Sequence, residues 1–190
     1  MNKLLAIDLS MRSAGLVVLD ANGQLVSQLL VPTMKEEYEG EFLLLYMESR
    51  IIDFASNFNP TSVVIEGLAF NSKSGAADLI AGNWWNIRKE LRSKYSRVSM
   101  GSIPVTTWRS KVLDLSKAGK ALLVQKYGDK LYLKQGVVDK TPHDVLAEFH
   151  AYLEVLKWPT KYPAAKKREA IYDLCDAYWL RRHRLNIGPI

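Results

Sequence analysis

Three apolar runs separated by turn signals open the chain and limit the kind of sheet that it can form. Residues 3–9, 15–20 and 24–31 are rich in Leu, Ile and Val, and an Asn-Gly pair at 22–23 lies between the second and third runs. Asn-Gly is the strongest short-range signal for a tight hairpin. The sequence therefore predicts a meander of three antiparallel strands that ends at Pro32.

Helices and strands alternate after this meander. Apolar residues recur at helical spacing over 36–57 and 75–94, and strands are expected over 62–66 and 98–106. The buried face expected for the first helix comprises Phe42, Leu45, Tyr46, Ser49, Ile52 and Phe54. This order predicts an α/β fold with a mixed five-stranded sheet, three antiparallel strands first, flanked by helices.

The second half of the chain is predicted to be helical. Helical segments are expected within 107–135, after Thr141 (as N-cap) and Pro142, and over 164–184. With 190 residues, the chain is expected to form one domain over 1–190.

Composition excludes several classes of protein. The single cysteine, Cys175, permits neither a disulfide framework nor a cysteine zinc cluster within the chain. It lies between Asp173 and Asp176, and we expect it to pack on the back of the last helix. No apolar run is long enough to span a bilayer, and Asp8 interrupts the amino-terminal run too early for a signal peptide. We therefore expect a soluble, cytoplasmic protein.

The net charge of +6 is unevenly distributed. Residues 1–85 carry −5, residues 86–134 carry +9 and residues 135–190 carry +2. Aromatic residues are interleaved with the basic middle segment, and lysine, arginine and aromatic side chains together suit phosphates and bases. The pattern favours a nucleic-acid partner, although a solvated charged face over an aromatic core explains the charge equally well.

Four carboxylates stand where a structural role explains them poorly. Asp8 lies within an apolar strand and Glu66 ends another, and a carboxylate is costly to bury without a partner. Asp173 and Asp176 are three residues apart on the last predicted helix, and therefore on one face. If the two strands are adjacent and the helix packs on them, all four acids converge. Such a cluster needs a counter-charge, and oxygen ligands favour Mg²⁺ or Mn²⁺.

Three motifs resemble those of the RuvC-type Holliday junction resolvases of the RNase H-like superfamily. Residues 6–15 are similar to the opening strand and turn, residues 63–70 to the second acidic motif, and residues 173–177 to the Asp-x-x-Asp-Ala core of the closing helix. The resemblance covers 3–127 and 165–182. Residues 128–163 depart from the bacterial pattern as a longer, more aromatic insertion, a region where viral members of the family vary.

The resemblance implies an endonuclease that resolves four-way DNA junctions by paired phosphodiester hydrolysis in the cytoplasm, which is the host's if the chain is viral. It implies that Asp8, Glu66, Asp173 and Asp176 are catalytic residues that bind two Mg²⁺ ions, with Mn²⁺ as a substitute. It also implies a homodimer formed through residues 75–94.

The resemblance further implies a set of DNA-binding residues. Phe70 follows the second acid, where the family places an aromatic wedge at the junction centre, although a core position explains it equally well. Phosphate contacts are implied for four cations of the basic stretch, which are Arg109, Lys111, Lys117 and Lys120. Trp84 and Trp85 serve either the dimer interface or the core. His143 is a candidate general base, but a capping or surface histidine is the favoured interpretation.

Other functions remain open on the sequence alone. The same fold could cut other branched DNA or RNA–DNA hybrids, or serve as a non-catalytic nucleic-acid-binding module. A module of that kind would be expected to lose acids, yet all four are present. The opening strand and turn also resemble those of actin-like and sugar-kinase phosphotransferases, which need two such domains, and 190 residues are expected to supply only one.

Overall fold

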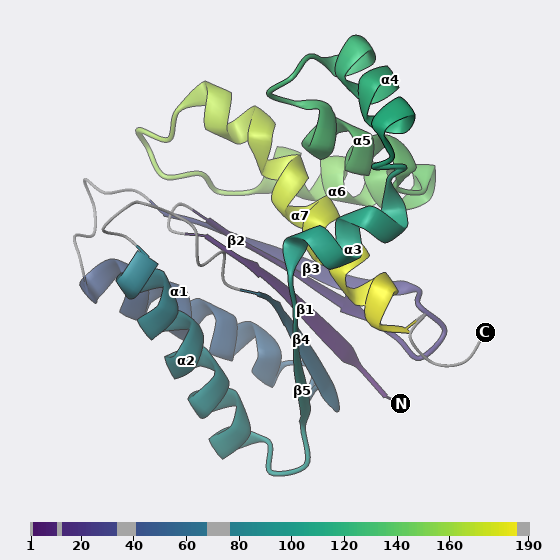
Figure 1. The fold of residues 1–190 in the computed structure, drawn as a ribbon. Coiled ribbons are helices and arrows are strands. Elements are labelled where there is room, and N and C mark those ends of the chain that lie inside the picture. The colour runs from purple at the N-terminus through teal and green to yellow at the C-terminus, as the bar shows by residue number, and fades with distance from the viewer. Residues whose placement is uncertain (1, 11–12, 34–40, 68–76, 186–190) are drawn as a thin grey trace.

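A computed structural model describes residues 2–10, 13–33, 41–67 and 77–185 of the chain (Figure 1). Its elements follow in the order β1 (Leu4–Leu9), β2 (Ser13–Leu19), β3 (Leu25–Pro32), α1 (Glu41–Ser56), β4 (Ser62–Glu66), α2 (Ala77–Lys94), β5 (Ser99–Ile103), α3 (Val105–Val112), α4 (Lys117–Tyr127), α5 (Tyr132–Lys140), α6 (His143–Val155) and α7 (Ala164–Leu185). The five strands form one sheet in the order β3-β2-β1-β4-β5.

The amino-terminal meander forms as predicted. β2 pairs antiparallel with both β1 and β3. In the turn between β2 and β3, Oδ1 of Asp20 accepts hydrogen bonds from the backbone N–H groups of Asn22 and Gln24. Gly23 has a φ of 80°, a conformation that a residue without Cβ adopts at little cost. The Asn-Gly signal therefore marks the hairpin.

Parallel pairing completes the sheet. β4 pairs parallel with β1, and β5 pairs parallel with β4. The mixed sheet with three antiparallel strands first, predicted from the sequence, is confirmed. β5 ends at Ile103, earlier than expected, because the chain turns at Pro104 into α3.

The sheet separates two hydrophobic cores. α1 and α2 cover one face, whereas α7 and the helices α3 to α6 cover the other (Figure 1). Successive side chains of a strand point to opposite faces, so Leu5 and Ile7 enter the core beneath α1 and α2, while Ala6 enters the core beneath α7. Asp8 follows Ala6 by two residues and is therefore directed to the α7 side. Within the described ranges, no helix is both long and apolar enough to cross a bilayer.

The buried face of α1 differs from the predicted one. Leu43, Met47 and Ile51 are buried, whereas Phe42 is 72% exposed and Leu45 is 56% exposed. The prediction of Phe42 and Leu45 as core residues was wrong. α1 carries apolar residues around most of its circumference, so their spacing does not determine which stripe faces the sheet.

α7 crosses β1 and β2 at close range. Gly15 of β2 makes this possible, because a Cβ atom there would overlap the backbone carbonyl of Asp173. Gly15 is also paired with Asp8 in the β1–β2 register. The absence of a side chain at one position therefore brings the backbone of α7 against the strand that neighbours Asp8.

The start of α6 departs from the predicted cap. Pro142 is the capping residue and has no side-chain cap hydrogen bond. The Thr141 hydroxyl instead donates to the backbone carbonyl of Val137 and accepts a hydrogen bond of 2.9 Å from Nε1 of Trp179. Thr141 therefore joins α5 to α7 rather than closing α6.

Candidate active site

Parallel pairing of β1 and β4 brings Asp8 and Glu66 side by side. Ile7 is in register with Ile65, so the two acids take the next positions, Glu66 at the end of β4 and Asp8 one residue before the end of β1. Both side chains are half-buried, and they lie close enough that the charge of Glu66 raises the pKa of Asp8. The expectation that the two acids lie on adjacent central strands is confirmed.

Asp173 and Asp176 reach the same place from α7. Between α7 and the sheet lies a pocket of about 240 Å³, hereafter the carboxylate pocket. All four predicted acids line it, together with Ser10, Ser13, Arg109, Lys134, Tyr162, Lys166, Glu169 and Ala170. The structure thus brings together four carboxylates that are spread over most of the chain.

Neighbouring side chains orient two of these acids. Nε1 of Trp108 donates a hydrogen bond of 3.1 Å to Oε1 of Glu66. Nε1 of Trp84 donates one of 3.1 Å to the backbone carbonyl of Glu66. The Ser13 hydroxyl donates to Oδ2 of Asp173. Each contact holds a single carboxylate oxygen or the backbone beside it, so the second oxygen of each acid can bind another group.

Arg109 neutralises part of the charge of the fourth acid. Its Nη2 lies 2.6 Å from Oδ2 of Asp176 in an ion pair, and both side chains are largely buried. The other oxygen, Oδ1 of Asp176, is buried and has no hydrogen-bond partner among the described residues. Because an unpaired buried acceptor is costly, this oxygen would be stabilised by a bound cation.

Burial and mutual repulsion hinder ionisation of the acids in the carboxylate pocket. Burial raises the pKa of Asp8 well above its usual value, and the charges of Glu66, Asp176 and Asp173 raise it further. Burial also raises the pKa of Asp173 and that of Asp176, although Ser13 and Arg109, respectively, oppose these shifts. A positive ligand in the pocket would favour the ionised carboxylates and so lower all three pKa values.

The donor set fits a divalent cation in its chemistry. Carboxylate oxygens are the ligands that Mg²⁺ and Mn²⁺ prefer. Within the part of the chain that the structure describes, however, no three acidic, histidine or cysteine side chains are grouped closely enough to hold an ion. Asp176 is instead paired with Arg109. Binding of an ion would replace this ion pair with oxygen–metal contacts.

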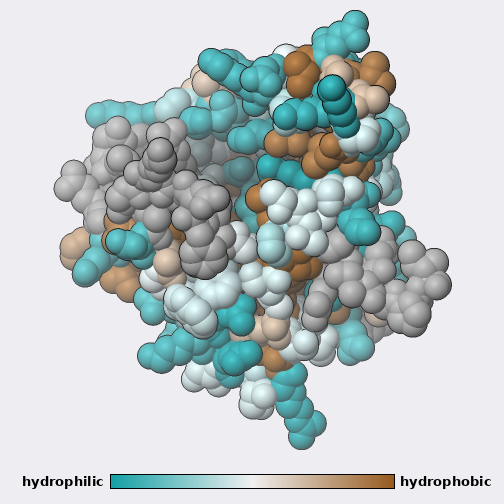
Figure 2. All heavy atoms as spheres, in the orientation of Figure 1, coloured by the Kyte–Doolittle hydropathy of each residue, from teal (hydrophilic) through white to brown (hydrophobic). Residues whose placement is uncertain are grey.

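The cations of the pocket are not those singled out from the sequence, apart from Arg109. Lys134 of α5 and Lys166 of α7 line the carboxylate pocket. Lys111, Lys117 and Lys120 are exposed on α3 and α4 and do not line it. Their part of the molecule presents a largely hydrophilic surface with apolar patches among it (Figure 2). These three lysines are thus free to contact DNA outside the pocket, which stays a prediction.

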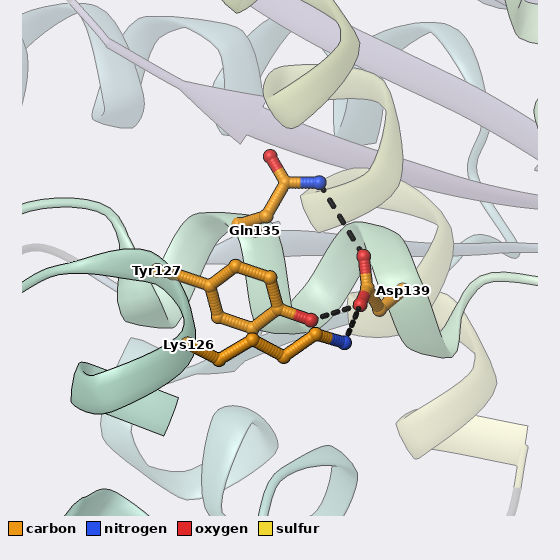
Figure 3. Close-up of polar contacts among 4 residues, drawn as sticks. All are labelled: Lys126, Tyr127, Gln135 and Asp139. Atoms are coloured by element: carbon orange, nitrogen blue, oxygen red, sulfur yellow. Dashed lines mark hydrogen bonds and ion pairs between the residues drawn. The ribbon is translucent and has the colours of Figure 1, made fainter. Parts of the chain in front are cut away.

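A polar cluster fastens α5, which carries Lys134, to its neighbours (Figure 3). Asp139 accepts hydrogen bonds from Nζ of Lys126 at 2.8 Å, from the hydroxyl of Tyr127, and from Nε2 of Gln135 at 3.4 Å. Oε1 of Gln135 accepts a hydrogen bond of 3.1 Å from Tyr172, which adjoins Asp173. Hydrogen bonds therefore connect α4 through α5 to the helix that carries the acids.

Some site residues were missed although the sequence contains a signal for them. Lys166 and Glu169 precede Asp173 by seven and four residues, the spacing that places them on the same helix face. Trp108 and Ser13 carry no comparable signal, because their contacts with the acids depend on how distant elements pack.

The remaining predicted residues have different positions. Phe70 lies outside the described residues. His143 is exposed at the start of α6 and does not line the carboxylate pocket. Trp84 is buried, whereas Trp85 is 62% exposed. Cys175 is fully buried, and burial raises the pKa of its thiol to about 12.

No protein-family model and no curated protein matches the sequence. Solved structures do resemble the fold. A Thermus thermophilus RuvC bound to a Holliday junction substrate matches with a TM-score of 0.55 and 12% identity, over 98% of this chain and 96% of that one.

Two further resolvases are similar. The fowlpox virus resolvase in complex with Holliday junction DNA has a TM-score of 0.51 and 10% identity, over 97% of each chain. The yeast mitochondrial Holliday junction resolvase has a TM-score of 0.50 and 12% identity, over 98% of this chain and 81% of that one. The chain therefore has the RNase H-like fold of these resolvases, as the sequence motifs indicated.

Proposed function

We propose that this protein is a divalent-metal-dependent endonuclease that cuts four-way DNA junctions. The observation that carries the proposal is the meeting of Asp8, Glu66, Asp173 and Asp176 in one pocket of a fold shared with Holliday junction resolvases. A cluster of partly or fully buried acids is expensive in a protein that does not use it. A cation-dependent reaction on an anionic substrate gives the cluster a purpose.

The four acids are the proposed ligands of two Mg²⁺ ions, for which Mn²⁺ would substitute. The chemistry that such ions supply is activation of a water nucleophile and stabilisation of charge on the leaving oxygen. Trp108 orients one oxygen of Glu66 and leaves the other for a ligand role. Ser13 does the same for Asp173.

Cations around the acids would attract and position the DNA backbone. Lys134 and Lys166 lie in the wall of the carboxylate pocket, where they would contact the phosphates next to the cut. Arg109 would move from Asp176 to a phosphate once an ion replaces it. Lys111 and Lys117 lie on the adjoining helices and would contact more distant phosphates.

We further propose that the protein acts as a homodimer. Cutting a junction on two strands requires two active sites, and each chain contributes one. α2 presents Trp85 and Leu79, which are 62% and 37% exposed, and α1 presents Phe42 and Leu45. Large exposed apolar side chains on neighbouring helices are typical of an association surface.

Cleavage of a mobile four-way junction tests the proposal. With Mg²⁺, the protein is expected to cut two opposed strands, and to cut linear, flap and RNA–DNA hybrid controls much more slowly. Asp8→Asn is expected to lower the cutting rate at least about 10³-fold, because it removes a ligand of the ions, while junction binding remains. Chelation of the metal is expected to have the same effect.

Asp53→Asn is the matched control, because Asp53 is an exposed acid of α1, away from the pocket. It should cut like the unaltered protein. Undiminished cutting by Asp8→Asn, or in chelator, would contradict the proposed site. Preferential cutting of flaps or hybrids would support the proposed active site but show that the four-way junction is not the preferred substrate.

A further inference from the structure

A second pocket lies on the opposite side of α7 from the acids. It has a volume of about 340 Å³ and is formed between α6, the segment 156–163 and α7. Its lining comprises His150, Leu153, Glu154, Trp158, Lys167, Arg168 and Ile171. None of these residues lines the carboxylate pocket, and none was given a role by the sequence motifs.

The second pocket combines apolar side chains with charged ones, among which cations outnumber acids. Leu153 and Trp158 are partly buried and Ile171 is buried, and together they supply the apolar part of the lining. Lys167 and Arg168 supply two positive charges against the one negative charge of Glu154, and no described residue makes an ion pair with either cation. Such a site suits a ligand that carries a planar apolar part next to a negative charge.

The charge of the surrounding segment points to an anion as well. Residues 157–168 contain five lysine and arginine residues and no acidic residue. Nζ of Lys167 lies 5.6 Å from the centre of the Trp158 ring, in a cation–π contact. A phosphate could draw this ammonium group away and leave the ring available to a base, because bases stack on aromatic rings.

The second pocket adjoins the carboxylate pocket. Tyr162, which lines the carboxylate pocket, packs against Trp158 with their ring centres 5.1 Å apart. Lys166 and Lys167 are consecutive on α7, yet each lines a different pocket. The two pockets are therefore separated by about one helix diameter, ~10–12 Å.

We propose that the second pocket binds one nucleotide of a DNA arm that leaves the carboxylate pocket. The base lies on Leu153 and Trp158, and the phosphate lies between Lys167 and Arg168. At ~3.4 Å per nucleotide along a strand, the bound nucleotide is about three or four positions from the cut. The inference rests on the DNA-binding part of the proposed function, because only DNA bound in the carboxylate pocket places an arm there.

Binding measurements test the subsite apart from cutting. In an Asp8→Asn background, Lys167→Glu with Arg168→Glu is expected to weaken binding of a long-armed four-way junction roughly tenfold or more. The same double change should hardly affect a junction whose arms end before the second pocket. The control is Arg50→Glu with Lys140→Glu, an equal change of charge at exposed residues outside both pockets.

Photocrosslinking identifies the contact directly. 5-Iodouracil placed at successive positions along one arm is expected to crosslink to Trp158 at about the third or fourth nucleotide from the cut. Trp158→Phe keeps a ring in the pocket and should retain affinity, whereas Trp158→Leu should lose it. Circular dichroism of both variants shows whether the fold is kept.

The outcomes separate the two proposals. If the charge-reversed protein binds long and short arms as the control does, or if crosslinks never reach Trp158, the subsite is refuted while the endonuclease stands. If the unaltered protein cuts no DNA yet Lys167 and Arg168 govern arm binding, the endonuclease fails and the subsite stands. Binding of an acidic peptide in preference to DNA arms would overturn the nucleotide assignment.

Discussion

The two faces of the sheet are formed by the same strands but differ in what they bury. On the α1–α2 face, Leu5 and Ile7 of β1 lie in an uninterrupted apolar core. On the α7 face, Ala6 is followed by Asp8, and Val64 of β4 is followed by Glu66, so the apolar core ends in acids. One face therefore buries hydrocarbon along the whole of β1, whereas the other replaces it with charge at the strand ends.

This difference shows how a domain of this size can carry a buried anionic site. Each desolvated carboxylate lowers stability, and the cost is offset by apolar burial elsewhere. Met47, Ile51, Ile87 and Leu91 supply that burial from α1 and α2, all with no exposed area. The face covered by α7, which carries the acids, depends instead on the close approach of α7 to Gly15. Two glycines on opposite faces allow this contrast to be tested.

Gly15→Ala is expected to have the largest effect. The new methyl group would overlap the Asp173 carbonyl and push α7 from the sheet. Overpacking of this kind costs about 1–3 kcal/mol of unfolding free energy, and misplacing catalytic groups by ~1 Å lowers activity on the order of 10²-fold. Chemical denaturation and junction cutting measure the two losses.

Gly82→Ala is the matched substitution on the other face. Gly82 lies within α2, where a Cβ atom would meet nothing within 4 Å. Replacing glycine by alanine inside a helix stabilises it by roughly 0.5–1 kcal/mol. Equal destabilisation by both substitutions would show that α7 does not depend on close contact at Gly15.

Charge reversal of Lys111, Lys117 and Lys120 is expected to have the next largest effect. If each contacts a phosphate, the slope of log K against log salt falls by about 3 in magnitude, and junction affinity drops on the order of 10²-fold at low salt. Reversal of Lys89, Arg92 and Lys94, exposed cations of α2, provides the comparison on the opposite face. An unchanged salt slope for the first set would remove α3 and α4 from the DNA-binding surface.

Trp108→Phe is expected to reduce cutting roughly tenfold, because groups that orient metal ligands typically contribute 10–100-fold. The ring still fills the buried site, but the donor to Oε1 of Glu66 is lost. The Mg²⁺ concentration required for half-maximal cutting should rise, a change that simple loss of packing would not produce. Trp84→Phe, which loses the hydrogen bond to the Glu66 backbone but none to its carboxylate, should leave that concentration nearly unchanged.

Trp85→Ser should weaken dimer formation without changing the rate at which one active site cuts one strand. Light scattering is expected to show a dimer for the unaltered protein and a larger monomer fraction for the variant, because a mostly exposed indole is removed from α2. Nicked junctions should then accumulate. If the unaltered protein is a monomer at high concentration, the paired-cut mechanism is wrong.

The order of the strands was predictable because its signals are local. The Asn-Gly turn and the β-branched run at β4 each specify an element within a few residues. The buried stripe of α1 was not predictable, since apolar residues such as Phe42 and Met47 occupy opposing sides of one helix. Only packing on the sheet decides between them.

The acids of the site could be predicted, but most of their partners could not. A carboxylate such as Asp8 within an apolar strand is conspicuous in any sequence. Ser13 meets Asp173 across 160 positions, and Trp108 meets Glu66 across 42. These contacts arise from tertiary packing, so neither residue type nor spacing reveals them.

The burial of Cys175 has a practical consequence for experiments on this chain. With a thiol pKa of about 12 and no exposed area, its side chain forms almost no thiolate at neutral pH. Maleimide reagents should therefore not react with Cys175. A cysteine introduced at an exposed position such as Lys140 should then be the only residue that is labelled. The native sequence can thus carry a single fluorophore at a chosen place without first removing its own cysteine.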